Sequence, residues 1–113
     1  MGGSVVNILQ FALDGVSQQQ SAIAGNLANA DTPGYTAEDV SFQQSLASAL
    51  SEGGTASISE NSSPAAPASD GNNVDLTTEL VAAQESALEY QQITHSLSAQ
   101  FRLAQGAAGG SFT

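Results

Sequence analysis

Apolar residues recur at alternating steps of three and four along the first part of the chain. Residues at these steps lie on one face of a helix, so the pattern predicts an amphipathic helix over residues 1–31. Its start is less sharply defined, because Gly2 and Gly3 are poor helix formers and Ser4 is a candidate N-cap. The predicted seam consists of Val6, Leu9, Leu13, Val16, Gln20, Ile23, Leu27 and Ala30.

The end of this helix is set by a Pro-Gly pair. Pro33 disfavours helical dihedral angles at Thr32, and Pro-Gly fits the two central positions of a type II turn. The helix is therefore predicted to end near Ala30 or Asp31. Gly34 is expected to adopt a positive φ, as the third residue of such a turn does.

A second seam with the same spacing predicts a helix over residues 74–106, followed by a tail at 107–113. Asp75 can cap the first turn, and Glu79 adds negative charge near the positive end of the helix dipole. Glycines from Gly106 onward supply the expected stop. The seam residues are Leu76, Leu80, Ala83, Ala87, Tyr90, Thr94, Leu97, Phe101 and Ala104.

The middle of the chain has a different composition. Residues 51–73 are mostly Ser, Ala, Gly, Glu, Asn and Pro, with Ile58 as the only large aliphatic residue. They are predicted to form a flexible, irregular polar linker, because they cannot build a core. Residues 32–50 contain the Pro-Gly turn and an intermediate segment, which is expected to dock on a neighbour as a short helix or an extended strip.

These elements predict an all-α fold in which two long terminal helices pack as an antiparallel-type coiled-coil hairpin within a helical assembly. The 113 residues suffice for one domain at most, and two helices with one seam give a thin structure rather than an enclosed core. The isolated chain is therefore expected to be partly or wholly unfolded, with partners supplying the missing burial. Gln20 and Thr94 interrupt the seams, either to fix helix register or as tolerated imperfections.

Charge and composition exclude several classes of partner. One Arg, no Lys and eleven acidic residues give a formal charge of -10, so nucleic-acid phosphates and anionic membrane surfaces should repel the chain. No apolar run is long enough for a transmembrane helix, and the N-terminus lacks the basic start and apolar stretch of a cleavable signal peptide. We therefore expect no nucleic-acid binding and no direct membrane insertion.

The sequence offers little catalytic or metal-binding chemistry. His95 is the single histidine and has no metal-ligand partner at helical spacing, and the chain contains no cysteine. Neither the Gly-x-Ser-x-Gly elbow of serine hydrolases nor the Lys-Ser/Thr of a phosphate loop occurs. We therefore expect no enzymatic activity, no cofactor and no metal.

One segment at the end of the first helix resembles the signature of bacterial flagellar axial proteins of the rod and hook family. Its residues are Asn26, Ala28, Asn29, Ala30, Asp31, Thr32, Pro33, Gly34 and Tyr35. A second segment looks most like the proximal rod subunits of that family. It comprises Asp70, Gly71, Asn72, Asn73, Val74, Asp75 and Leu76, followed by Glu79, Ala87, Leu88, Tyr90 and Gln91.

The resemblance implies a structural subunit that assembles with copies of itself and other flagellar rod proteins into a rigid, torque-transmitting tube. It implies terminal segments that are disordered in the monomer and pair as helices in the assembly. Contacts with the MS ring and with export-gate or adaptor components follow from it, as does flagellar type III export without a cleaved signal peptide. The implied location is the basal-body rod on the periplasmic side. Tyr35 is expected to anchor the turn to an adjoining helix. The turn is expected to aim residues 36–50 outward or along the assembly, where they would bridge neighbours.

Two other classes stay open at this point. A small secreted helical-hairpin effector or export-partner protein has a similar size, although such proteins usually carry Trp-x-Gly at the hairpin turn and this chain has no Trp. A cytoplasmic coiled-coil adaptor or chaperone is the third class. A stable helical dimer in solution favours either of these, whereas a weakly helical monomer favours an axial protein.

Overall fold

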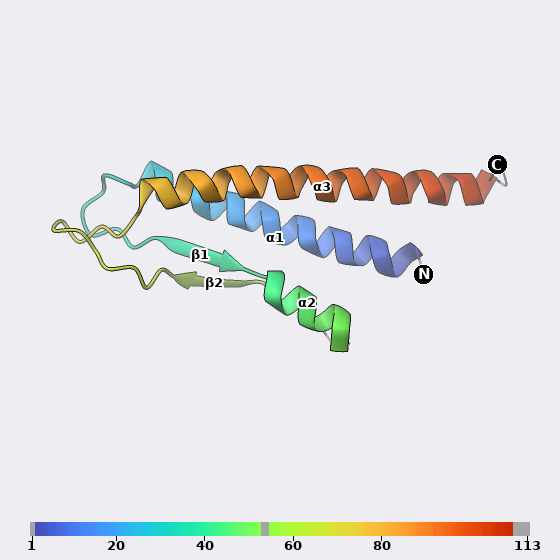
Figure 1. The fold of residues 1–113 in the computed structure, drawn as a ribbon, viewed down its shortest axis with the longest axis horizontal. Coiled ribbons are helices and arrows are strands. Elements are labelled where there is room, and N and C mark those ends of the chain that lie inside the picture. The colour runs from blue at the N-terminus through green and yellow to red at the C-terminus, as the bar shows by residue number, and fades with distance from the viewer. Residues whose placement is uncertain (1, 53–54, 110–113) are drawn as a thin grey trace.

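The computed structural model describes residues 2–52 and 55–109. Over these residues the elements follow in the order α1 (Gly2–Ala28), β1 (Glu38–Ser41), α2 (Gln43–Glu52), β2 (Ser59–Ser62) and α3 (Leu76–Gly109). α1 and α3 lie side by side, and β1 packs beside α1 (Figure 1). The molecule is long and thin, with extents of 64 × 26 × 14 Å.

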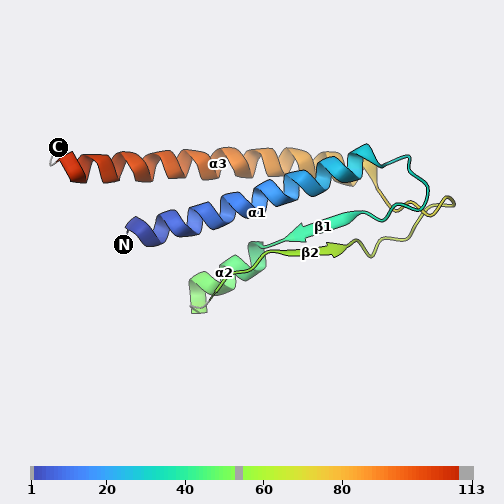
Figure 2. The ribbon, with the colours of Figure 1, turned by 180° about the vertical axis from the view of Figure 1, so that it is seen from behind.

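The structure contains the two long terminal helices that the sequence predicts, and they run in opposite directions (Figure 2). The structure is mostly helical as predicted, but it also contains a small sheet, in which β1 and β2 pair antiparallel with Glu38 opposite Ser62 and Ser41 opposite Ser59. The four residues of β2 are polar and exposed, so this strand lacks the apolar alternation that indicates a strand. The predicted irregular linker of residues 51–73 therefore contains a strand that is held by backbone pairing.

The core gathers around Phe42, which stands between β1 and α2. Phe42 is 3% exposed and packs with Ala12 and Val16 of α1. The ring of Phe11 meets it edge to face, with the ring centroids 6.2 Å apart. The partly buried residues packed against this cluster are Phe11, Leu46, Ile58 and Ile93. The segment predicted to dock on a neighbour thus docks on α1 of its own chain, and it uses both expected forms, an extended strip and a short helix.

The predicted seam of α1 points only partly inward. Val16 is fully buried, whereas the other seam residues are half-buried. The buried positions outside the seam are Ala12, Gly15 and Asn26. These residues are small or polar, so the pattern of large apolar residues in the sequence does not indicate that they are buried.

The predicted packing of the α3 seam against the α1 seam is not found. Its residues Leu76, Leu80, Ala87, Tyr90, Phe101 and Ala104 are exposed in the single chain, and Leu97 is the seam residue that is buried. From Glu79 to Ile93 the inward face lies one position earlier in the sequence than the seam, a rotation of about 100° about the helix axis, and it meets the seam at Leu97. It is formed by Glu79, Ala82, Ser86, Glu89, Ile93, Leu97 and Gln100.

Two features explain this rotation of α3. A hydrogen bond from Asn26 draws Glu79 inward at the start of the helix. Farther along, the small side chains of Ala82 and Ser86 occupy the inward face, and small residues let two helices approach closely. The larger apolar side chains are left on the outer face, and their contact with neighbouring subunits stays a prediction.

The helix ends differ slightly from the predicted ones. α1 begins at Gly2, so Ser4 is not its N-cap, and it ends at Ala28 rather than at residue 30 or 31. Asp75 caps α3 as predicted, because its Oδ1 accepts a hydrogen bond from the amide of Thr78 at 3.1 Å. α3 continues through Gly106 to Gly109, which places its stop later than predicted.

Candidate functional site at the helix junction

Residues 32–35 form the turn that follows α1. The amide of Tyr35 donates to the carbonyl of Thr32 at 3.2 Å, and Gly34 has a φ of +75°. These are the hydrogen bond and the dihedral angle of a type II turn with Pro33 and Gly34 at its centre. The predicted turn and the positive φ of Gly34 are confirmed.

Asn26 lies at the centre of the contacts between this turn and the rest of the chain. Its side chain is 1% exposed, and Nδ2 donates to the carbonyl of Glu38 at 2.9 Å and to Oε1 of Glu79 at 2.6 Å. Oδ1 accepts from the amide of Glu38 at 2.9 Å and from the hydroxyl of Tyr35 at 3.2 Å. A side-chain amide has two donors and an oxygen with two lone pairs, so all its capacity is used. One side chain thus joins α1, the turn, β1 and α3.

Asn29 closes the end of α1. Its Nδ2 donates to the carbonyl of Gly25 at 2.9 Å, and its Oδ1 accepts from the hydroxyl of Thr32 at 3.1 Å. The backbone amide of Asn29 binds the same carbonyl at 3.1 Å, so Asn29 joins the last turn of α1 to Thr32 of the following turn. Of the remaining residues in the motif, Ala30 is half-buried, whereas Ala28, Asp31 and Pro33 are exposed.

Asn72 binds the turn from the other side. Its Nδ2 donates to the carbonyls of Asn29 and Thr32, both at 2.8 Å, and its Oδ1 accepts from the amide of Val74 at 2.8 Å. The amide of Gly34 donates to the carbonyl of Asp70 at 2.9 Å. The two segments that resemble axial proteins therefore bind each other, although they are far apart in the sequence. We call their contact, residues 26–38 with 70–79, the junction.

Asn73 extends the junction to the segments that precede β1 and follow β2. Its Oδ1 accepts from the amide of Ala37 at 2.7 Å, and its Nδ2 donates to the carbonyls of Ser63 and Ala65 at 3.1 Å. Asn72 and Asn73 are residues whose structural role the sequence did not indicate. The signals in this segment were its resemblance to rod subunits and the composition of Asp70-Gly71-Asn72-Asn73, which is typical of turns, and neither indicates which atoms the two asparagines bind.

Glu79 is the titratable group of the junction whose pKa departs from its ordinary value. Burial raises the pKa of its carboxyl, the hydrogen bond from Asn26 lowers it, and the charges of Asp39 and Asp75 raise it further. The net direction is upward from 4.5. A raised pKa in the folded state means that ionised Glu79 destabilises the fold relative to protonated Glu79.

We expect this to appear as pH dependence. The contribution of Glu79 to stability is most favourable at low pH and decreases as the pH rises from 4.5 through the raised pKa. Glu79→Gln, which keeps an acceptor for Asn26, should remove this dependence. The measurement is folding induced by trimethylamine oxide and followed by circular dichroism at several pH values. Glu60→Gln, an exposed change on β2, is the control that should behave like the wild type.

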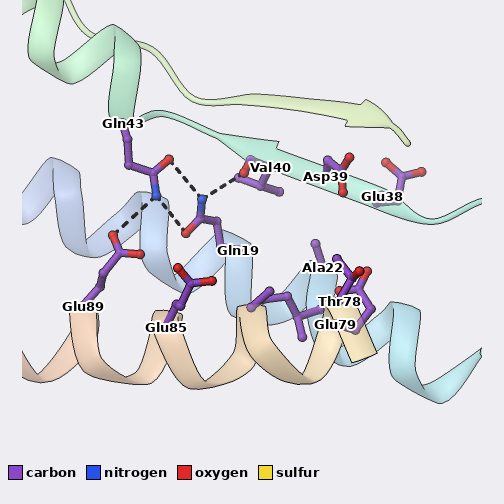
Figure 3. Close-up of a pocket in the computed structure, with 12 residues that line it drawn as sticks. Gln19, Ala22, Glu38, Asp39, Val40, Gln43, Thr78, Glu79, Glu85 and Glu89 are labelled. Atoms are coloured by element: carbon purple, nitrogen blue, oxygen red, sulfur yellow. Dashed lines mark hydrogen bonds between the residues drawn. The ribbon is translucent and has the colours of Figure 1, made fainter. Parts of the chain in front are cut away.

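A groove with an acidic lining runs beside the junction, between α1, β1 and α3. Gln19 and Gln43 exchange two hydrogen bonds there, at 3.2 and 3.3 Å, and Gln19 also donates to the carbonyl of Val40 at 2.9 Å (Figure 3). The carboxylates that line the groove are Glu38, Asp39, Glu79, Glu85 and Glu89. The groove therefore presents negative charge at the surface.

Within residues 2–52 and 55–109, no three His, Cys, Asp or Glu side chains gather in a way that could hold a metal ion. His95 is exposed on α3. None of the helices in these ranges combines the length and the apolar character that crossing a membrane requires.

Comparison with known proteins identifies relatives over most of the chain. The family described as "Flagella basal body rod protein" matches residues 7–36, which include most of α1 and the turn. Flagellar basal body rod protein FlgB of Escherichia coli K12 is 31% identical, over 82% of this chain and 84% of the relative. FlgB of Salmonella typhimurium is likewise 31% identical, and FlgB of Aeromonas hydrophila is 32% identical over 74% of this chain and 76% of the relative.

Proposed function

Because this chain belongs to the flagellar basal-body rod protein family, we propose that the junction and the outer face of α3 make it a structural subunit of the proximal rod. The resemblance to the proximal rod protein FlgB is confirmed by relatives that match at least 30% of positions over most of the chain. A structural role in the rod is not an enzymatic one. This is in line with the lack of catalytic motifs in the sequence.

The observation that carries the proposal is the outer face of α3. Large apolar side chains are between 40% and 61% exposed along this helix, whereas its inward face holds mostly small and polar residues, with Ile93 and Leu97 as its large apolar members. An extended apolar surface on a thin molecule is typical of a protein that binds neighbours. The residues of this outer face are Leu76, Leu80, Val81, Leu88, Tyr90, Phe101 and Leu103.

The mechanism that we propose is rigidity through paired helices. α1 and α3, with 27 and 34 residues, form rods of about 40 and 51 Å at 1.5 Å per residue. The junction fixes one end of α3 on α1, so the two helices move as one element. Neighbouring subunits bury the outer face of α3, and the resulting tube transmits torque.

The partners that we propose are copies of this chain, other rod proteins, and MS-ring and export-gate or adaptor components at the proximal end. The subunit would pass the flagellar type III export machinery unfolded and assemble on the periplasmic side. The thin shape and the small core support this, because few side chains hold the isolated chain together. We therefore infer that the purified chain is a weakly helical monomer.

Polar substitution of the outer face tests the proposal. Leu80→Gln and Leu88→Gln together should leave the junction and the core intact but abolish rods, because each buried leucine contributes about 1.5 to 3 kcal/mol at an interface. Swimming in soft agar and electron microscopy of basal bodies are the measurements. Gln18→Ala, an exposed change on α1, is the control. Normal rods in the double variant would show that the outer face does not carry assembly.

The turn offers an independent test. Gly34→Val should impair rod assembly and swimming while synthesis and export remain, because valine at a φ of +75° costs about 1 to 2 kcal/mol or more. No atom lies within 4 Å of an added Cβ, so the penalty comes from the backbone angle alone. Gly34→Asn is the matched control, since asparagine tolerates this angle. Equal effects of the two substitutions would contradict this explanation.

The secreted helical hairpin and the cytoplasmic adaptor are not retained. No feature of the described residues favours either class, and the rod relatives match the two segments on which the resemblance was based. Size-exclusion chromatography of the purified chain still separates the classes, because both alternatives require a stable helical dimer.

A further inference from the structure

An apolar cleft of about 290 Å³ opens between α2 and α3. Its walls include the side chains of Phe42, Leu46, Leu50 and Ile93, and Leu50 is 59% exposed. Glu89 also lines this cleft and the neighbouring acidic groove. The cleft thus combines an apolar interior with a carboxylate, and we call it the α2 cleft.

The carboxylate of Glu89 has hydrogen-bonding capacity to spare. Nε2 of Gln43 donates to its Oε2 at 3.4 Å, which is long for a hydrogen bond (Figure 3). A carboxylate can accept about four hydrogen bonds, and two of them from one guanidinium. The carboxylate of Glu89 can therefore accept hydrogen bonds from the guanidinium of an arginine that belongs to another molecule.

The chain has one arginine and no lysine, and the position of that arginine is informative. Arg102 is exposed near the end of α3, and the adjacent Phe101 and Leu103 are 50% and 49% exposed. This end of α3 extends past the start of α1 (Figure 1). Residues 101–103, which we call the tip, thus carry one positive charge between two exposed apolar side chains near this end of α3.

The tip cannot reach the α2 cleft of its own chain. Ile93 and Ala104 belong to the same continuous helix and lie about 16 Å apart along its axis at 1.5 Å per residue. A tip that fills the cleft would therefore belong to another molecule. Two copies with a charge of -10 each repel, so a contact that pairs the one cationic side chain with a carboxylate lowers this repulsion.

We propose, on the premise of the rod function, that the tip of one copy docks in the α2 cleft of a second copy. Phe101 or Leu103 fills the apolar cleft, and Arg102 pairs with Glu89. Each copy then offers one tip and one cleft, which are different surfaces. Such a head-to-tail contact has a direction and can continue from copy to copy, as an axial assembly requires.

Cysteine cross-linking in flagellated cells tests this contact, because the natural chain has no cysteine. A chain carrying Ala47→Cys at the cleft and Ala104→Cys at the tip should give a ladder of dimers, trimers and larger species on oxidation. Disulfides form only where Cα atoms lie within about 7 Å, so a bond within one chain is excluded. Either single variant should give no ladder, since one cysteine can join at most two copies.

Charge reversal identifies the contact. Arg102→Glu in the double-cysteine chain should lower the cross-linked fraction about tenfold, because a charged hydrogen-bonding pair is lost. Adding Glu89→Lys to that chain should restore much of it. Sedimentation velocity of the purified full chain with trimethylamine oxide gives a second readout that needs no flagellum. Association should be strongest for the wild type, weakest for Arg102→Glu, and largely restored when Arg102→Glu is combined with Glu89→Lys.

The outcomes separate this inference from the rod function. Swimming cells with rods but without a ladder would overturn the head-to-tail contact and leave the rod function standing. Cross-links from the Ala47→Cys position to a different protein would also overturn it, because the occupant would then be another rod component. If the cysteine variants do not swim, sedimentation decides, and a wild-type chain that stays monomeric throughout would overturn the contact.

Discussion

Asn26→Ala is expected to release α3 from α1 at the junction and to abolish rod assembly. The substitution removes both hydrogen bonds to Glu38 and the bonds to Tyr35 and Glu79. The carboxylate of Glu79, a residue that is 7% exposed, then loses its donor. A buried polar group without a partner costs about 1 to 3 kcal/mol, and more if it is charged. The free energy of unfolding should therefore fall by on the order of 3 kcal/mol or more.

The measurement is the trimethylamine oxide concentration at which the chain becomes helical, together with swimming of the variant strain. Asn7→Ala is the matched control, because Asn7 is an exposed asparagine on the same helix. Its folding midpoint should stay close to that of the wild type. If the two variants had equal midpoints, the junction would not hold α3 in place.

The second large effect is expected at Gly15. An added Cβ there would lie 2.5 Å from Cγ of Phe42, so Gly15→Ala must displace the ring at the centre of the core. Overpacking of this kind costs about 1 to 3 kcal/mol. At an ordinary helix position the same change stabilises by about 0.5 to 1 kcal/mol. The sign of the effect therefore reports whether Phe42 packs on α1.

Gly25→Ala is the matched control for Gly15→Ala. It lies in the same helix, and the nearest atom to its added Cβ is the hydroxyl of Tyr35 at 3.8 Å, an ordinary contact. It should promote folding, whereas Gly15→Ala should hinder it. Phe42→Leu in the Gly15→Ala chain should recover part of the loss. Stabilisation by both alanines would mean that Phe42 does not dock on this face.

Periodicity predicted the two terminal helices correctly, but it could not predict which face of α3 packs against α1. The sequence predicts that the apolar stripe of α3 packs against α1. A sequence shows where an apolar face is, but it does not show which surface covers that face. The hydrogen bond between Asn26 and Glu79 turns that face away from α1. Such a bond joins residues 53 positions apart, and no local pattern indicates it.

The turn at Pro33 and Gly34 was predictable, because its dihedral angles follow from the two residue types. β2 was not predictable, since its polar residues pair only through the backbone. The roles of Asn72 and Asn73 could not be predicted for a related reason. Their side chains bind backbone atoms of the first motif and of the segment after β2, so their function exists only in the folded chain.

Electron microscopy of basal bodies from a strain that lacks this chain tests the assignment as a rod subunit most directly. The account predicts basal bodies without a rod, and complete rods once the wild-type chain is supplied again. Complete rods in the strain that lacks the chain would contradict it.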